Sequence, residues 1–364
     1  VLSSDELSDF PPEAPVSNDP TIAHPVIFPD LFDRPLVATF DQPHASSDGG
    51  AVLLKAVDRQ LALTRRLAGP LADPRAPARV THTIADLVAQ RIFGLACGYA
   101  DGNYADRLAE DPIQKLLLDR DPIGGQALAS QPTLSRFENA VGPRALYQMG
   151  RELAATVIAR HRQRLAGRAR RITIDLDVTD DPTHGAQQLS FFHGHYDTWC
   201  YLPLLAFVTF NDEADAYLCA AVLRPGNAAS AAGAEGVVRA IYTVIRSAFP
   251  HTTVRVRLDG GFATPALLDY LDRIGVEYVV AMAENAVLAR RAEAQMVDVR
   301  TVVAATGTTA HVYSDTVYAA RSWSRDRAWS PCDRSMGMRS DTWRNSMVKT
   351  FRMQPCVVGR LWHD

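Results

Sequence analysis

A segment near the middle of the chain alternates aliphatic and polar residues and then ends in a group of carboxylates. Within residues 170–185, RRITIDLDVTDDPTHG, aliphatic side chains take every second position from Ile172 to Val178. This period of two predicts a strand with one apolar face, and it places Asp175 and Asp177 together on the opposite face. Two anions on one strand edge repel each other unless a cation lies between them, and a divalent metal ion with oxygen ligands is the usual solution.

A second segment repeats this arrangement. Residues 251–261, HTTVRVRLDGG, carry Val254, Val256 and Leu258 on one face and reach Asp259 just before two glycines. Taken singly, an aspartate at a strand end is weak evidence for a metal site, because aspartates are also common in turns and helix caps. The two segments predict a site only if the fold brings their ends together.

The hydrophobic period around these segments predicts a mixed order of strands and helices. We expect strands at 171–178, 199–210 and 216–223, a helix at about 229–248, a strand at 253–259, a helix at 264–274 and a strand at 276–283. This order predicts an α/β (α+β) fold with a mixed sheet and flanking helices. It is similar to the ribonuclease H-like fold, in which the first and fourth strands lie side by side and carry catalytic carboxylates at adjacent ends. In that arrangement Asp177 and Asp259 converge, as two-metal phosphoryl transfer requires.

Length and composition describe a globular protein of more than one domain. The chain has 364 residues, of which 47% are hydrophobic and 22% charged, and its formal net charge of −3 neither indicates nor excludes a nucleic-acid partner. The five cysteines lack CxxC spacing, and we find no signal peptide or membrane span, so we expect a cytoplasmic protein. We expect four regions: a disordered or loosely docked arm at 1–33, a helical DNA-binding domain at 34–169, an incomplete catalytic core at 170–327 and an aberrant tail at 328–364.

Arginines gather at the end of a helix expected at about 144–165, just before the first acidic strand. They are Arg160, Arg162, Arg164, Arg168, Arg170 and Arg171. Six guanidinium groups in this position could line a track for DNA phosphates. They could equally be a solvated helix end whose cations complement the helix dipole. The sequence leaves both interpretations open.

Two further features have a functional and a structural interpretation. The segment SQPTLSRFENAV at 130–141 superficially suits a DNA recognition helix, although a plain surface helix is favoured. His184, His193 and His195 could suggest a zinc hydrolase. They lack an acidic ligand at secure spacing, so roles in a loop close to DNA are favoured.

Several segments together resemble one known family. They are DLDVTDDPTHG (175–185), FFHGHYDTWCYLPLLAF (191–207), VLRPGNA (222–228), RLDGGF (257–262) and DYLDRIGVEYVVAMAEN (269–285). The chain is similar to the DDE transposases of bacterial insertion sequences, in the group named for insertion sequence thirteen-eighty, from about residue 30 to residue 327. The resemblance implies a ribonuclease H-like core in which two aspartates and a glutamate bind Mg²⁺ (or Mn²⁺). It further implies DNA partners, namely the element ends and the target, a homo-oligomer on that DNA, and joining of freed 3′ hydroxyls to the target.

Carried over by position, the first family carboxylate falls on Asp177 and the second on Asp259. Asp175 is a same-face neighbour of the first and a possible co-ligand. The family places its glutamate on a helix after the fifth strand, in a motif of tyrosine, arginine, glutamate and lysine, and this motif is not found here. Glu284 comes too early in the chain to take that place.

The residues after Arg327 stop resembling the family, and the stretch from 328 to 364 contains no glutamate and no apolar period. Such a change predicts an out-of-frame tail on a truncated gene, poorly ordered or loosely packed, and hence an inactive transposase copy. Two alternatives stay open. The chain could be a metal-dependent nuclease on the same fold, or a catalytically silent DNA-binding regulator of transposition.

Overall fold

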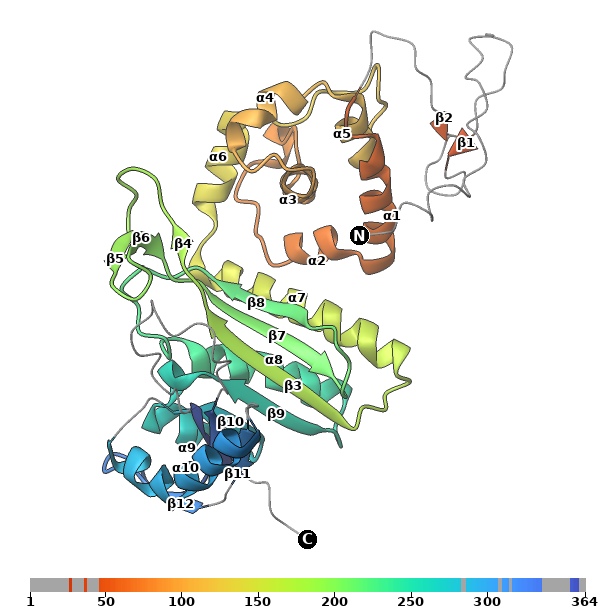
Figure 1. Ribbon diagram of the computed structural model, residues 1–364. Helices are drawn as coiled ribbons and strands as arrows, with labels where there is room; N and C mark the ends of the chain where they lie inside the picture. Colours follow the sequence, from red (N-terminus) through yellow and green to blue (C-terminus); the bar gives the residue numbers. More distant parts are fainter. Residues whose placement is uncertain are drawn as a thin grey trace, which may run out of the picture. The chain divides into compact units, whose positions relative to one another are not determined.

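The computed structural model describes residues 46–282, 286–306, 310–313, 316–335 and 354–359, together with two short strands. These are Val26–Ile27 (β1) and Leu36–Val37 (β2), which pair antiparallel. The chain forms two compact units (Figure 1). One comprises residues 1–60 and 74–140, and the other comprises 61–73 and 141–364.

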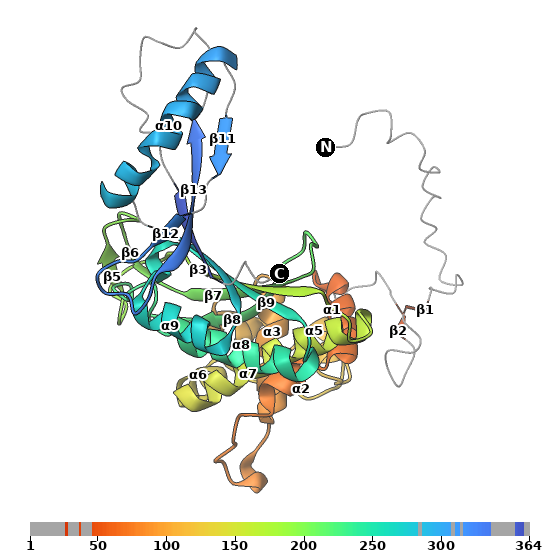
Figure 2. The ribbon, with the colours of Figure 1, turned by 90° about the horizontal axis from the view of Figure 1, so that it is seen from below.

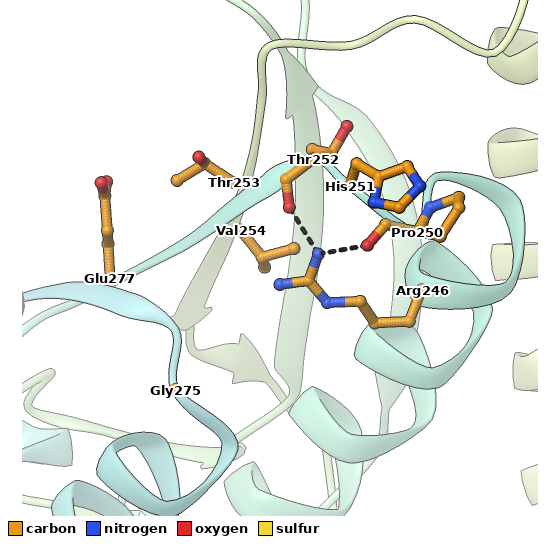
Figure 3. Close-up of a pocket in the computed structure, with 8 residues that line it drawn as sticks. All are labelled: Arg246, Pro250, His251, Thr252, Thr253, Val254, Gly275 and Glu277. Carbon is orange, nitrogen blue, oxygen red and sulfur yellow. Dashed lines mark hydrogen bonds between the residues drawn. The ribbon is translucent and has the colours of Figure 1, made fainter.

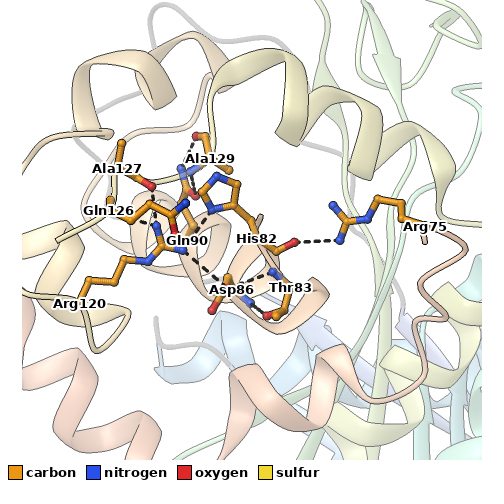
Figure 4. Close-up of polar contacts among 9 residues, drawn as sticks. All are labelled: Arg75, His82, Thr83, Asp86, Gln90, Arg120, Gln126, Ala127 and Ala129. Carbon is orange, nitrogen blue, oxygen red and sulfur yellow. Dashed lines mark hydrogen bonds and ion pairs between the residues drawn. The ribbon is translucent and has the colours of Figure 1, made fainter. Parts of the chain in front are cut away.

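The first unit is built from short helices. They are Val52–Leu61 (α1), Ile84–Ala96 (α3), Ala105–Leu108 (α4), Pro112–Leu117 (α5) and Gln131–Ala140 (α6). Helix α3 begins at a capping box, because the Thr83 hydroxyl accepts a hydrogen bond from the Asp86 amide at 3.1 Å and the Asp86 carboxylate accepts one from the Thr83 amide at 3.0 Å. Figure 4 shows Arg120 next to this cap, with its guanidinium 3.1 Å from Nδ1 of His82.

The second unit contains a nine-stranded mixed sheet. Its strands are Arg171–Val178 (β3), Leu204–Phe210 (β7), Tyr217–Val222 (β8), Thr253–Leu258 (β9), Glu277–Ala281 (β10), Ala310–Tyr313 (β11), Thr316–Tyr318 (β12), Arg327–Ser335 (β13) and Gln354–Gly359 (β14). The order is β11-β13-β14-β10-β9-β3-β7-β8, with β12 paired to β13. Strand β3 is antiparallel to β7 and parallel to β9. The predicted α/β class with a mixed sheet is confirmed, as is the pairing of the first expected strand with the fourth.

Helices cover the apolar face of this sheet. The second unit contains helices Leu63–Ala68 (α2), Pro143–Arg164 (α7), Ala234–Ala248 (α8), Pro265–Ile274 (α9) and Ala286–Thr306 (α10). Residues of α7, α8 and α9 share one core with Ile172 and Ile174 of β3, and Figure 2 shows the three helices on one side of the sheet. Since α7 packs on the sheet, the division of the chain falls at residue 140 rather than at the predicted boundary of 169. None of the described helices is long and apolar enough to cross a membrane.

The strand expected at 199–210 is two strands. Thr198–Tyr201 (β6) ends before Leu202 and Pro203, and β7 begins at Leu204. Proline cannot donate a backbone hydrogen bond to a sheet, which explains the interruption. Strand β6 joins Asp181–Pro182 (β4) and Phe191–His193 (β5) in a separate three-stranded sheet of order β4-β6-β5. We call residues 179–203 the hairpin insertion.

Two stretches of the expected tail form strands. Strand β14 pairs antiparallel with β10, and β13 pairs with β14. The sequence predicted a poorly ordered or loosely packed tail at 328–364, whereas residues 328–335 and 354–359 lie in strands of the sheet. Pairing of backbone groups needs no amphipathic period, so the composition of this stretch did not reveal the strands. Residues 336–353 and 360–364 lie outside the described residues, as do residues 1–25 and 28–33 of the expected arm.

Arg327 closes the core of the second unit. Its side chain is 2% exposed, and Nη2 donates to Asp269 and Asp272 of α9 at 2.8 Å each. Its Nε donates to the hydroxyl of Tyr278 in β10 at 3.0 Å. The indole of Trp323 stacks on the guanidinium at 5.2 Å. One arginine thus joins the end of the predicted core to a helix and a strand.

We expect Arg327→Met to lower the free energy of unfolding of this unit by about 3–5 kcal/mol, because it leaves the half-buried carboxylate of Asp272 without its buried partner. Arg325→Met is the matched control. Arg325 also pairs with Asp272 but is 60% exposed, and exposed ion pairs contribute about 1 kcal/mol or less. Urea unfolding followed by circular dichroism measures both variants. Equal midpoints for the two would contradict the structural role of Arg327.

Candidate active site

The parallel pairing of β3 with β9 brings Asp177 and Asp259 to the same edge of the sheet. The register places Asp175 opposite Arg257 and Leu176 opposite Leu258. The next step along both strands places position 177 beside position 259. Residues paired in parallel strands point to the same face, and both aspartates are exposed. The sequence predicted the pairing of these two strands from the order of elements.

Local hydrogen bonds orient both carboxylates. Oδ1 of Asp177 accepts from the backbone amide of Val178 at 2.8 Å, and Oδ1 of Asp259 accepts from that of Gly261 at 2.8 Å. The second bond caps a 3₁₀ turn at Gly260–Phe262. A side chain at position 261 would not fit, since a Cβ there would lie 2.7 Å from the hydroxyl of Ser230. Gly261 is therefore part of how the chain holds this carboxylate.

Tyr196 of the hairpin insertion lies next to these carboxylates. Its hydroxyl donates to the carbonyl of Val178 at 3.3 Å. Burial raises the pKa of Tyr196 above its ordinary value, and the charges of Asp180, Asp177 and Asp259 raise it further. The phenol therefore lies near three carboxylates from two separate segments of the chain. The segment FFHGHYDTWC was noted in the sequence, but nothing there identified its tyrosine as part of the site.

Asp175 has a partner of its own. Nε and Nη2 of Arg257 donate to its two carboxylate oxygens at 2.5 and 2.9 Å, in the bidentate geometry typical of arginine and carboxylate. The hydrogen bond to Asp175 raises the pKa of Arg257. This cross-strand contact balances the charge of Asp175 and gives it a structural role that the sequence did not predict. Its role as a metal co-ligand stays a prediction.

The described residues offer two carboxylates rather than a full metal site. Among them, no three histidine, cysteine, aspartate or glutamate side chains are arranged to hold a metal ion. The rings of His193 and His195 lie 6.5 Å apart and perpendicular, which does not suit a shared ligand position. Glu284 lies outside the described residues. Asp177 and Asp259 carry the oxygen ligands that a divalent cation prefers, and their role as metal ligands stays a prediction.

The arginine cluster lies at the other end of β3. Half of its members form ion pairs with the turn after β7: Arg164 with Glu213 at 2.6 Å, and Arg170 and Arg171 with Asp212. Arg160, Arg162 and Arg168 are exposed. From Arg171 to Asp177 the strand advances about 20 Å, at about 3.3 Å per residue. The structure therefore gives three of the six arginines acidic partners and leaves the phosphate-track interpretation to Arg160, Arg162 and Arg168.

A polar hollow lies at the start of β9, away from Asp259 (Figure 3). Arg246 of α8 fixes its rim by donating to the carbonyls of Pro250 and Thr252. Glu277 lies across the hollow and pairs with Arg255 at 2.8 Å. Because β9 separates the hollow from the two aspartates, it is not part of the candidate site.

Comparison with known proteins identifies one family. The sequence profile described as Transposase DDE domain group 1 matches residues 28–329. None of the curated proteins compared with this chain matches it.

Three solved structures show a distant likeness. A piggyBac transposase synaptic complex with hairpin DNA is 11% identical, with 85% of this chain and 60% of that chain covered and a TM-score of 0.32. A Mos1 transposase paired-end complex with the left transposon end is 12% identical, with 66% and 61% covered and a TM-score of 0.20. A Mos1 mariner paired-end complex with Mn is 10% identical, with 64% and 78% covered and a TM-score of 0.20. The chain spans about three fifths of the first two, and these TM-scores are too low to define a common fold.

The convergence of carboxylates on Tyr196 can be tested without any activity. We expect Asp177→Asn to lower the pKa of the Tyr196 phenol, because removing a nearby negative charge makes the tyrosinate less unfavourable. NMR of ¹³C-labelled tyrosine, with Tyr196→Phe to assign the signal, measures this pKa. Asp197→Asn is the control, since Asp197 lies next to Tyr196 in the chain and is not among the charges that shift it. An unchanged pKa in Asp177→Asn would show that the two side chains lie apart.

Proposed function

Because the chain belongs to the Transposase DDE domain group 1 family, we propose that it carries the DNA-cleaving and strand-transferring site of such an enzyme on a ribonuclease H-like core. The observation that supports this most directly is the placement of Asp177 and Asp259 on adjacent, parallel strand ends, inside the span that matches the family. The DNA partners would be the ends of an insertion sequence and its target. We further propose that the protein acts as a homo-oligomer on that DNA.

Asp177 and Asp259 would hold Mg²⁺ or Mn²⁺. A divalent cation at this place stabilises charge on the attacking and leaving oxygens of phosphoryl transfer. The residues of this chain prepare the site by orientation, since backbone amides fix one oxygen of each carboxylate. Tyr196 donates to a backbone carbonyl next to Asp177 and so holds the hairpin insertion against the strand end.

Whether this chain is catalytically active depends on a third carboxylate ligand. The family match ends at residue 329, and residues 328–364 contain no glutamate. Two carboxylates bind a divalent cation more weakly than three, and they leave part of the developing charge without support. We therefore propose a truncated copy of low or no activity. The same observation favours our second candidate, a catalytically silent protein that binds DNA and regulates transposition.

We expect the chain to bind Mn²⁺ through this pair, and Asp177→Asn or Asp259→Asn to weaken that binding by roughly tenfold or more, because each removes a charged oxygen ligand. Electron paramagnetic resonance of free Mn²⁺ measures the affinity. Asp212→Asn is the control, since Asp212 pairs with Arg170 and Arg171 at the other end of β3, and we expect its affinity to stay within about twofold. Equal affinities for the parent and both strand-end variants would exclude the proposed site.

Products formed on DNA with element ends separate the candidate functions. Joined strand-transfer products identify a transposase, whereas cleavage alone identifies the nuclease alternative. DNA retained by the Asp177→Ala, Asp259→Ala double mutant, when the parent shows neither activity, identifies the silent regulator.

The exposed arginines can be tested by the salt dependence of DNA binding. We expect Arg160, Arg162 and Arg168 changed together to alanine to weaken binding to all sequences. Their loss should also reduce the slope of log affinity against log salt by about 0.9 for each lost phosphate contact. Fluorescence anisotropy across a salt series measures the slope. The control is Arg170→Ala, whose guanidinium is paired with Asp212. A triple variant with the parental slope would leave the cluster as a solvated helix end.

A further inference from the structure

Arg224 is a buried cation held by backbone carbonyls. It lies between β8 and α8 and is 7% exposed. Its Nε donates to the carbonyl of Leu202 at 2.8 Å. Its Nη1 lies within hydrogen-bond distance of three further carbonyls, those of Ala229 at 3.1 Å, Ser230 at 3.0 Å and Ala232 at 2.9 Å. Within the described part of the chain, Nη2 has no hydrogen-bond partner.

Burying this guanidinium is unfavourable for the folded state. Taking a charge out of water without an opposite charge costs several kcal/mol, of which hydrogen bonds to neutral carbonyls recover only part. Burial accordingly lowers the pKa of Arg224. A well-packed apolar side chain would avoid this penalty but could not bind four carbonyls. The arginine is therefore explained by the geometry it imposes rather than by stability alone.

The carbonyls that Arg224 binds belong to two different segments. Leu202 lies near the end of the hairpin insertion, and its amide in turn donates to the carbonyl of Arg224 at 3.1 Å. Residues 229–232 form the turn that leads into α8. Gly226, between them, packs tightly on the hairpin insertion, since a Cβ there would lie 2.0 Å from the carbonyl of Cys200. Residues 224–232, which we call the brace, therefore join the hairpin insertion to the start of α8.

The brace also contacts the turn that holds Asp259. The Ser230 hydroxyl lies so close to Gly261 that a Cβ at position 261 would be 2.7 Å from it. The Gly261 amide in turn donates to Oδ1 of Asp259 at 2.8 Å. A continuous chain of contacts thus runs from Arg224 through Ser230 and Gly261 to the carboxylate.

We propose that Arg224 is a positioning residue, which sets the orientation of Asp259 through the brace and holds the hairpin insertion beside it. The consequence for cation binding rests on the function proposed above. The orientation itself does not, because it can be measured on the chain in the absence of metal and DNA. Its sequence signal was the arginine in VLRPGNA, a segment whose role the sequence did not reveal.

The test compares Arg224→Met with Arg246→Met in the full chain. Methionine keeps an unbranched, flexible side chain and removes every donor. Arg246 also donates to backbone carbonyls, but beside the start of β9. Hydrogen exchange resolved by NMR reports the Gly261 amide separately from the amides of β9. We expect Arg224→Met to speed exchange at Gly261 by about tenfold or more and to leave β9 within about twofold, while Arg246→Met leaves Gly261 unchanged.

Two outcomes would overturn the inference. Parental exchange at Gly261 in folded Arg224→Met shows that the brace does not set this turn, and equal acceleration throughout β9 shows a general stabilising role. If Arg224→Met does not fold, Ser230→Gly decides, since it keeps Arg224 and removes the contact with Gly261. Faster exchange at Gly261 in Ser230→Gly supports the proposal, and parental exchange opposes it.

Mn²⁺ affinity of the same variants is then a separate readout. A parent that binds no Mn²⁺ defeats the proposed function, while the exchange result still decides the role of Arg224.

Discussion

The parallel register between β3 and β9 is the constraint on which the candidate site depends. Each strand supplies one carboxylate, and neither segment alone suggests more than a turn aspartate. A shift of one residue in this register would move one aspartate to the apolar face, because side chains alternate along a strand. The apolar residues of both strands are buried in the core shared with α7, α8 and α9, so the register is fixed by the packing of that core. The position of the two charges therefore follows from burial on the opposite face.

Charge on the exposed face of the sheet is balanced locally except at its end. Asp175 faces Arg257 and Glu277 faces Arg255, and both pairs join neighbouring strands. Among the described residues, no guanidinium makes such a contact with Asp177 or Asp259. Backbone amides orient the carboxylate oxygens of these two aspartates instead. Amides orient a carboxylate without neutralising it, whereas an arginine does both. The face thus changes from internal ion pairs to uncompensated negative charge at the strand ends, where a cation would bind.

The sequence predicted the parts of this structure that depend on local periodicity. Strand β3, helix α9 with its glycine stop at Gly275, and the pairing of β3 with β9 follow from apolar spacing and element order. Tyr196 and Arg224 could not be predicted in this way, because their roles arise from contacts between segments whose own patterns are weak. The partners of the arginine cluster could not be predicted for a related reason. A run of like charges in the sequence does not show that Asp212 and Glu213, far along the chain, neutralise half of it.

Arg327 lies where the predicted core ends, and its side chain still packs into that core. It is buried between α9 and β10, and the family match ends two residues after it. Among the described residues up to this point, each buried lysine or arginine has a partner of opposite sign or a set of carbonyls. Strand β13, which begins at Arg327, and strand β14 extend the sheet by backbone pairing, which almost any residues can provide. A catalytic carboxylate cannot be supplied in that way, since it needs one particular side chain at one particular place. Extension of the sheet beyond Arg327 therefore continues the fold of the core but does not by itself complete its chemistry.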